Sequence, residues 1–197
     1  DHHECRVRLG VIVVLVGPIV VIETLLFCPM RIGNLASLDI DQHLRWVKHG
    51  REQRLFITIP GEQVKNSTPL YYELSGPSAE IMRHYIDEVP PSLSNTPCTA
   101  LFPKLDGKTK NPGELSNQIK RHIFAETGLT VNAHLFRSLA SKIHNLVHAG
   151  DAATISHVLG DRMATVMKAY SQFEQKSALD TYQSSVNAVR GRGKAAA

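Results

Sequence analysis

The first long run of hydrophobic positions spans residues 11–27, VIVVLVGPIVVIETLLF, and it predicts a helix. At 17 residues the run is slightly short for a membrane span, and it contains Gly17-Pro18 and the charged Glu23. These interruptions favour a buried core helix over a membrane helix. The helix is expected to end near Cys28-Pro29, because proline disfavours the helical conformation in the residue before it.

A second, shorter helix is predicted directly afterwards. Leu35 and Leu38 have the spacing of one helical face, and Asp39-Ile40-Asp41 is expected to close the helix.

The pattern then changes to one typical of strands. The β-rich runs are Leu44 with Trp46, residues 55–59 and residues 69–74. His49-Gly50 and the polar stretch 61–68 separate them and resemble turns. This region predicts a small antiparallel sheet of about three strands.

The rest of the chain is predicted to be mainly helical. Ser78 is a candidate N-cap for a helix over residues 78–87, and the five prolines of residues 89–113 predict a long surface loop with one apolar anchor, 100–102. Further helical patterns cover residues 114–127, 134–148, 151–159, 163–170 and 174–189. The predicted fold is therefore mainly α (α+β), with one small three-stranded antiparallel sheet inserted early.

Charge adds a weak indication of the partner. The formal net charge is 22 − 18 = +4. Residues 101–150 contain seven Lys or Arg and three Asp or Glu, which gives the same excess of four, and four of the ten histidines. A localised basic excess is compatible with nucleic-acid binding, although many unrelated proteins share it.

Cysteine usage argues against a disulfide framework or a zinc site. Cys5, Cys28 and Cys98 are far apart and form no C-x-x-C pair. His144 and His148 share an i,i+4 face but lack a third ligand in the sequence pattern. We therefore expect no metal, no cofactor, and a reducing, cytoplasmic location.

Several residues with phosphate chemistry follow one another in a suggestive order. His134 and Arg137 are three apart, so they share one face of a predicted helix. Arg31 follows the first helix, Lys65 lies in the polar turn before the third strand, and Tyr170 comes 33 residues after Arg137. Each has an ordinary structural interpretation by itself, and Lys48 and Tyr182 are rivals for the lysine and the tyrosine.

Together these motifs resemble the tyrosine recombinases of the phage integrase family. The resemblance is carried by Arg31-Ile-Gly-Asn-Leu, by Val64-Lys65-Asn-Ser-Thr-Pro-Leu, by His134-x-x-Arg137, and by Ala149-Gly150 followed by residues 155–160 and a tyrosine nine residues after Asp161. It covers about residues 11–188, the family's helical DNA breaking-rejoining catalytic domain. Residues 1–190 are thus expected to form that domain, residues 191–197 a flexible tail or cloning remnant, and the N-terminal DNA-clamping domain is expected to be absent.

The resemblance implies a role for each residue. Arg31 and Arg137 would hold the phosphate, Tyr170 would attack it to form a 3′-phosphotyrosine, Lys65 would protonate the leaving 5′ oxygen, and His134 would act as base or support. Because the bond energy is conserved, neither ATP nor a metal is required.

The sequence departs from the family pattern at two positions. Asp161 stands where the family usually has histidine, sometimes tryptophan, and a carboxylate there would repel the developing charge unless it points away or is protonated. His157, one helical turn earlier, is a candidate substitute. Asn34 stands where glutamate is common.

Three functions remain open from the sequence. The first is a site-specific recombinase or integrase of bacterial or mobile-element origin, nucleoid-associated, that acts on double-stranded DNA with other subunits, as a tetramer in synapsis. The second is a degenerate integrase that binds DNA but cleaves poorly, and the third is a type IB topoisomerase-like enzyme. Small-molecule substrates and membranes are not expected. The last predicted helix favours the first function, because such tails pack on neighbouring subunits in this family; its apolar face contains Phe173, Ala178, Leu179, Tyr182 and Val186.

Overall fold

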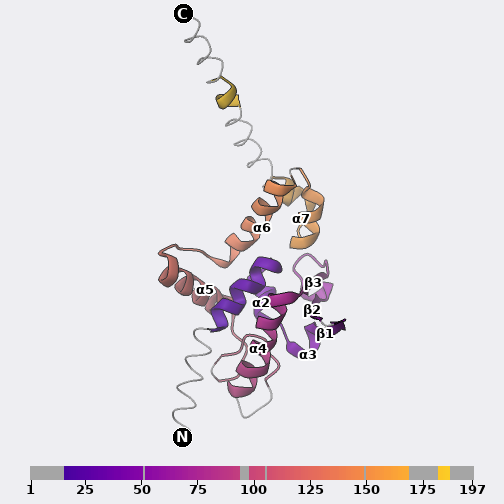
Figure 1. The fold of residues 1–197 in the computed structure, drawn as a ribbon, viewed down its shortest axis with the longest axis vertical. Coiled ribbons are helices and arrows are strands. Elements are labelled where there is room, and N and C mark those ends of the chain that lie inside the picture. Colours follow the sequence, from indigo (N-terminus) through magenta and orange to yellow (C-terminus); the bar gives the residue numbers. More distant parts are fainter. Residues whose placement is uncertain are drawn as a thin grey trace, which may run out of the picture. The chain divides into compact units, whose positions relative to one another are not determined.

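The computed structural model describes residues 16–50, 52–93, 98–104, 106–148, 150–168 and 182–186 of the 197-residue chain. The chain divides into two compact units. One extends to Ala140 and also includes Val158–Gly160, and the other consists of Ser141–His157 and the residues from Asp161 onward. Figure 1 gives the element labels used below.

The first described element of the first unit is the helix of residues 16–27, which confirms that the apolar run is helical in this part. Val20, Val21 and Leu25 are buried, so the helix contributes to the core. The helix ends before Cys28-Pro29, as predicted from the proline. Residues 11–15 lie outside the described residues. In the part of the chain that the structure describes, no helix combines the length and the hydropathy that crossing a membrane requires.

Two short helices follow, α2 (Ile32–Ala36) and α3 (Ile40–His43). The prediction that Asp39 closes a helix was wrong, because Asp39 begins α3 instead. Its carboxylate accepts hydrogen bonds from the backbone N–H groups of Asp41 and Gln42, both at 3.0 Å. A short acidic side chain at this position satisfies donors that the first turn of a helix leaves open.

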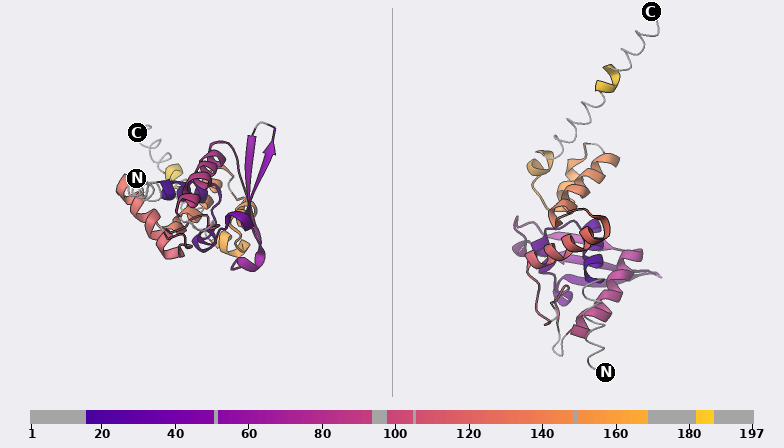
Figure 2. Two further views of the ribbon diagram at one scale, coloured as in Figure 1. Left: turned by 90° about the horizontal axis from the view of Figure 1, so that it is seen from below. Right: turned by 90° about the vertical axis from the view of Figure 1, so that its left-hand side faces the viewer.

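The predicted sheet is confirmed. Its strands β1 (Leu44–His49), β2 (Glu52–Ile59) and β3 (Leu70–Leu74) form an antiparallel sheet in the order β1-β2-β3. Leu44 pairs with Ile57, and Ile59 pairs with Leu70. Alternate residues of β2 and β3 are buried, so one face of the sheet packs into the core. The free end of the β1–β2 hairpin extends beyond β3 (Figure 2, left).

Helix α4 (Gly76–Leu93) packs on β2 and is longer than predicted. The expected surface loop starting at residue 89 was wrong at this end, because the helix continues through Pro90-Pro91, where Val89 and Pro90 are buried. Packing therefore compensates locally for the donors that proline lacks. Ser78 is not the N-cap; it is buried, and its hydroxyl donates to Oε1 of Glu23 at 2.6 Å.

The predicted apolar anchor is confirmed, since Leu101 and Phe102 are among the most buried side chains of the first unit. Next comes α5 (Pro112–Thr127), which packs on α2 and begins with a capping box between Asn111 and Glu114. Helices α6 (Ala133–Val147) and α7 (Ala152–Leu159) agree with the predicted ranges to within one residue at each end.

The second unit is described for part of its length. Residues 163–168 and 182–186 are helical. Ile155 and Val166 are buried, and Asp151 accepts a hydrogen bond from the backbone of Thr154 at 3.1 Å. Hydrogen bonds from Thr154, together with nearby His144, hold the pKa of Asp151 below its ordinary value. The remainder of the predicted helices at 163–170 and 174–189, and the tail 191–197, lie outside the described residues.

Candidate active site

The end of α7 is where distant parts of the first unit meet. Three successive backbone carbonyls accept hydrogen bonds from three side chains. Val158 accepts from the Tyr72 hydroxyl at 2.9 Å, Leu159 from Nη2 of Arg137 at 3.0 Å, and Gly160 from Nδ2 of Asn66 at 3.1 Å. The last carbonyls of a helix lack partners within the helix, so side-chain donors are needed there. We call these three carbonyls the α7 carbonyl cluster.

Gly160 permits this arrangement in two ways. Its φ of +58° is in the left-handed region that favours glycine. A Cβ atom at this position would also collide with the side chain of Leu70, on β3. The end of α7 therefore lies directly on the sheet only because residue 160 has no side chain.

Arg137 connects the α7 carbonyl cluster to the region of Arg31. It lies on α6 and is 5% exposed, and its Nη1 donates to the carbonyl of Pro29 at 2.7 Å. Pro29 precedes Arg31 by two residues. The two carbonyls fix the guanidinium at a junction of the α2 start, α6 and the end of α7.

Arg31 is the residue before α2, in an extended conformation, and its side chain is half-buried with Nη1 enclosed. Asn34, one turn later on α2, is 8% exposed. Within the described part of the chain, Nδ2 of Asn34 has no hydrogen-bond partner. The side chains of Arg31 and Asn34 thus both lie mainly inside the protein.

Lys65 lies, as predicted, in the connection between β2 and β3, and its side chain is exposed. The residues around it are not loose: Val64 is buried, and Asn66 binds the α7 carbonyl cluster. Asn66 and Arg137 bind neighbouring carbonyls, those of Gly160 and Leu159, so the connection that carries Lys65 meets Arg137 at the α7 carbonyl cluster.

The expected convergence of His134 and Arg137 is only partly visible. Both are on α6, but His134 is exposed in its first turn, whereas Arg137 is buried. His157 and Asp161 belong to the second unit. His157 is exposed, and the backbone of Asp161 is held by Ser156, whose hydroxyl donates to the Asp161 carbonyl at 2.7 Å.

Tyr170 lies outside the described residues. Its rival Tyr182 is described and is 66% exposed.

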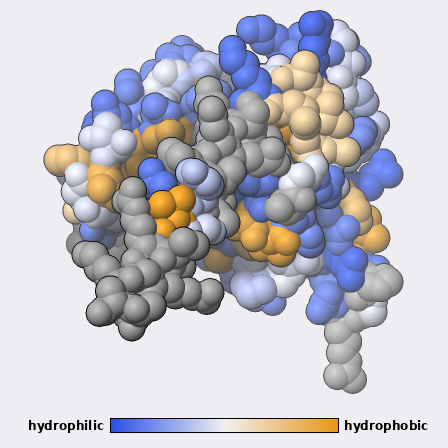
Figure 3. Space-filling model, turned by 90° about the horizontal axis from the view of Figure 1, so that it is seen from above, coloured by the Kyte–Doolittle hydropathy of each residue, from blue (hydrophilic) through white to orange (hydrophobic). Residues whose placement is uncertain are grey.

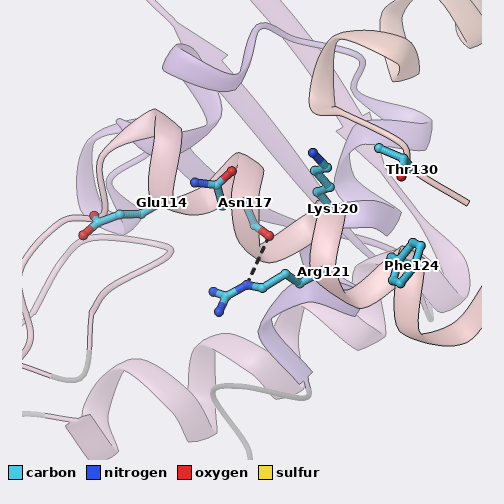
Figure 4. Close-up of a pocket in the computed structure, with 6 residues that line it drawn as sticks. All are labelled: Glu114, Asn117, Lys120, Arg121, Phe124 and Thr130. Carbon is cyan, nitrogen blue, oxygen red and sulfur yellow. Dashed lines mark hydrogen bonds between the residues drawn. The ribbon is translucent and has the colours of Figure 1, made fainter. Parts of the chain in front are cut away.

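A second surface lies along α5 (Figure 4). A hollow of about 730 Å³ is lined by Asn117, Lys120, Arg121, Phe124 and others on α5 and the following segment. Nε of Arg121 donates to the carbonyl of Asn117 at 3.4 Å, which keeps the guanidinium along the helix. Two adjacent cations and an exposed aromatic ring are groups that nucleic-acid-binding surfaces use.

Metal ligation is not suggested by the described residues, where no group of three or more His, Cys, Asp or Glu side chains is placed to hold an ion. Cys28 is enclosed in the core, where burial raises the pKa of its thiol to about 12. It is a packing residue rather than a nucleophile.

The sequence did not point to Tyr72 or Asn66 as parts of the site. Asn66 had a local signal, because it follows Lys65 directly. Tyr72 resembles any strand residue, and its bond to Val158 joins positions 86 apart, which no local pattern reveals.

Comparison with known proteins identifies relatives of this chain. XerC, a tyrosine recombinase of Alcanivorax borkumensis, is 23% identical over 165 residues, which cover 82% of this chain and 50% of that protein. The chain thus spans about half the length of this curated relative.

Solved structures show the same fold. A XerH site-specific recombinase bound to palindromic difH substrate, in a post-cleavage complex, superposes with a TM-score of 0.64 and 19% identity, covering 85% of this chain and 45% of that one. The XerA recombinase gives a TM-score of 0.62 and 16% identity, covering 93% and 63%.

The model of the phage integrase family matches residues 19–176, well over half of the sequence. This range includes every candidate site residue, from Arg31 to Tyr170. The prediction from the motifs is confirmed: the chain belongs to the phage integrase family.

Proposed function

We propose that the chain is the catalytic part of an enzyme that cuts and rejoins double-stranded DNA through Tyr170, as a site-specific recombinase or integrase. The observation that carries the proposal is the position of Arg137. Its guanidinium bonds to the carbonyls of Pro29 and Leu159, which gathers three separated family motifs around one buried cation.

The two arginines suit the charge of the reaction. A phosphodiester carries one negative charge, and more develops on its non-bridging oxygens as a nucleophile approaches. Guanidiniums can bind such oxygens in pairs and stabilise that charge. Arg137 is held by two backbone carbonyls, and one of them belongs to Pro29, two residues before Arg31.

Cleavage then requires one nucleophile and one acid. Oη of Tyr170 attacks the phosphorus, and the bond to the 5′ oxygen breaks. The tyrosine proton passes to a base, for which His134 is the candidate, and Lys65 gives a proton to the leaving oxygen. The product is a 3′-phosphotyrosine and a free 5′ hydroxyl, and attack by another 5′ hydroxyl reverses the step without ATP. The arginines supply the positive charge for which other phosphoryl-transfer enzymes use a metal.

A second candidate function rests on Asp161. A carboxylate where the family usually has histidine would oppose the developing charge, so the protein would bind DNA and cleave it slowly. In the first function we propose that His157 partly substitutes for the missing histidine. If His157→Ala left the rate of cleavage unchanged, this role of His157 would be excluded.

DNA binding is supported by the surface of α5 and by the local excess of positive charge. Lys120 and Arg121 are both exposed on α5, and XerH has been solved bound to its difH substrate. Contacts of this kind go mainly to phosphates and release counterions, so affinity is expected to fall steeply with salt.

Assembly with other subunits on DNA, as a tetramer in synapsis, is supported by apolar surface. Figure 3 shows hydrophobic side chains reaching the surface in separate patches, and the second unit exposes Ile143, Leu146, Val147 and Met167. We propose that the segment after Glu174 packs on a neighbouring subunit. A truncation at Glu174 that assembled normally on DNA would count against this.

The deciding experiment is covalent capture on nicked duplexes from a random-sequence library, which trap the intermediate because the cleaved strand diffuses away. Wild-type protein is expected to form a covalent adduct with DNA, Tyr170→Phe none, and the matched control Tyr182→Phe as much as wild type. An adduct that persists in Tyr170→Phe would refute the assignment. Binding without any adduct in the wild type would favour the second candidate function.

A further inference from the structure

The loop between β2 and β3, residues 60–69, has a shape enforced by its own packing. A Cβ atom on Gly61 would lie 2.7 Å from the carbonyl oxygen of Ser67, so the two ends of the loop approach one another closely. Ser67 adopts a φ of +55°. Val64, which lies between Gly61 and Ser67 in the sequence, is buried. The loop is therefore a closed structure with Lys65 at its exposed side.

Ahead of Lys65 the loop is fastened to α3. His43, 5% exposed, accepts the backbone N–H of Asp39 on Nδ1 at 2.8 Å. The ring proton of the neutral imidazole must then be on Nε2, which lies 2.8 Å from Oε1 of Gln63 and donates to it. Gln63 precedes Lys65 by two residues.

After Lys65 the loop is fastened to the α7 carbonyl cluster. Nδ2 of Asn66 donates to the carbonyl of Gly160, the residue before Asp161. One hydrogen bond thus lies on each side of the lysine, and each joins the loop to a different part of the first unit.

We propose that Gln63 and Asn66 are positioning residues that hold Lys65 at the leaving oxygen. This inference rests on the proposed role of Lys65 as general acid. A lysine has four rotatable bonds, and proton transfer needs its Nζ within hydrogen-bond distance of the oxygen. Fixing the backbone on both sides restricts where the ammonium group can reach, and it raises the fraction of time spent in the productive geometry.

The test compares two leaving groups. One substrate has the ordinary 5′ oxygen at the scissile phosphate, and the other has sulfur in that bridging position. A thiol has a pKa near 8.5, far below that of an alcohol or water at about 16, so a thiolate leaves without a proton. Loss of the acid should therefore slow cleavage of the oxygen substrate only.

Gln63→Ala and Asn66→Ala, which removes the donor to Gly160 without adding a charge, are expected to slow cleavage of the oxygen substrate about 10-fold. On the sulfur substrate both should cleave at the wild-type rate. The matched control is Gln53→Ala, an exposed glutamine on β2, which should behave as wild type on both substrates. If Lys65→Ala is rescued by sulfur but the two variants are not, they act through general folding and the inference is overturned.

A second measurement does not depend on cleavage. Hydrogen exchange at the backbone amides of residues 64–67 is expected to become at least several-fold faster in both variants, while the β1–β2 hairpin is unchanged. Unchanged exchange in the loop would overturn the inference. If instead Lys65→Ala is not rescued by sulfur, the proposed acid role of Lys65 fails, and the exchange result still decides whether Gln63 and Asn66 hold the loop.

Discussion

The two connections in the sheet differ sharply, although each joins a pair of neighbouring antiparallel strands. Between β1 and β2 the chain reverses within two residues, because His49 pairs with Glu52, and Gly50 has a φ of +62° with open space around its Cα. Between β2 and β3 it takes residues 60–69, fastened through Gln63 and Asn66. The short turn needs only a backbone conformation, whereas the long loop needs partners from elsewhere in the fold. Functional residues are often found on loops that a rigid scaffold holds in position, and the β2–β3 loop is held in this way.

The largest effect is expected from Lys65 in the long loop, and Lys48, near the end of β1 next to the short turn, provides the comparison. Lys65→Ala should slow DNA cleavage by about 100-fold or more, the usual range for loss of a general acid, with unchanged stability because its side chain is exposed. Lys48→Ala, on exposed β1, should leave the rate unchanged. Single-turnover rates of adduct formation would measure the effect of each substitution. If both variants lost the same rate, Lys65 would have no special role.

Substitutions of Gly61 and Gly50 should distinguish the effect of a steric clash on stability from the effect of backbone conformation. Gly61→Ala places a Cβ against the Ser67 carbonyl and should destabilise the protein by about 1–3 kcal/mol, as overpacking does. Gly50→Ala meets no atom within 4 Å and should cost only about 1 kcal/mol, for its positive φ. Denaturant unfolding would measure the loss of stability in each variant. A larger loss of stability for Gly50→Ala than for Gly61→Ala would contradict the prediction.

The smallest effect concerns Asp39, whose backbone N–H begins the chain of bonds that reaches Gln63. Asp39→Ala should cost about 1 kcal/mol as loss of an N-cap. Burial raises the pKa of Asp39, but hydrogen bonds from Thr99, Gln42 and Asp41, with nearby His43, outweigh it and leave the pKa below its ordinary value.

The sign of the pH dependence follows from that lowered pKa. The ionised carboxylate stabilises the folded state above the ordinary pKa of about 3.9, and this contribution is lost as pH falls through the lower folded pKa. The difference in unfolding free energy between wild type and Asp39→Ala should therefore be constant from pH 6 to 8 and shrink below about pH 4. Asp87→Ala, exposed on α4, serves as the control. A difference that grows in acid would be inconsistent with the observed hydrogen bonds.

Sequence reasoning succeeded where local chemistry decides the structure. The β-rich residue types of positions 55–59, the turn at His49-Gly50 and the proline at position 29 each act on their neighbours, so the strands and the end of the first helix could be predicted. It failed at Pro90-Pro91 of α4, where the helix continues and Val89 and Pro90 are buried.

The candidate site was predictable as a set of residue types in order but not as an arrangement. Arg31, Lys65 and Arg137 follow the family pattern, and the family is confirmed. That Arg137 rests on the carbonyls of Pro29 and Leu159, or that Asn66 reaches Gly160 from 94 positions away, depends on how the chain folds over long range. No spacing rule contains that information.

The bond between Arg137 and the carbonyl of Pro29 also orders events during translation. It joins residues 108 positions apart, so Pro29 and Arg31 are synthesised long before Arg137. At roughly 5–20 residues per second this interval lasts about 5–20 s. A nascent chain can thus expose Arg31 while the remaining groups of the candidate site are still unmade. The complete set of proposed catalytic groups exists only after synthesis has reached Tyr170.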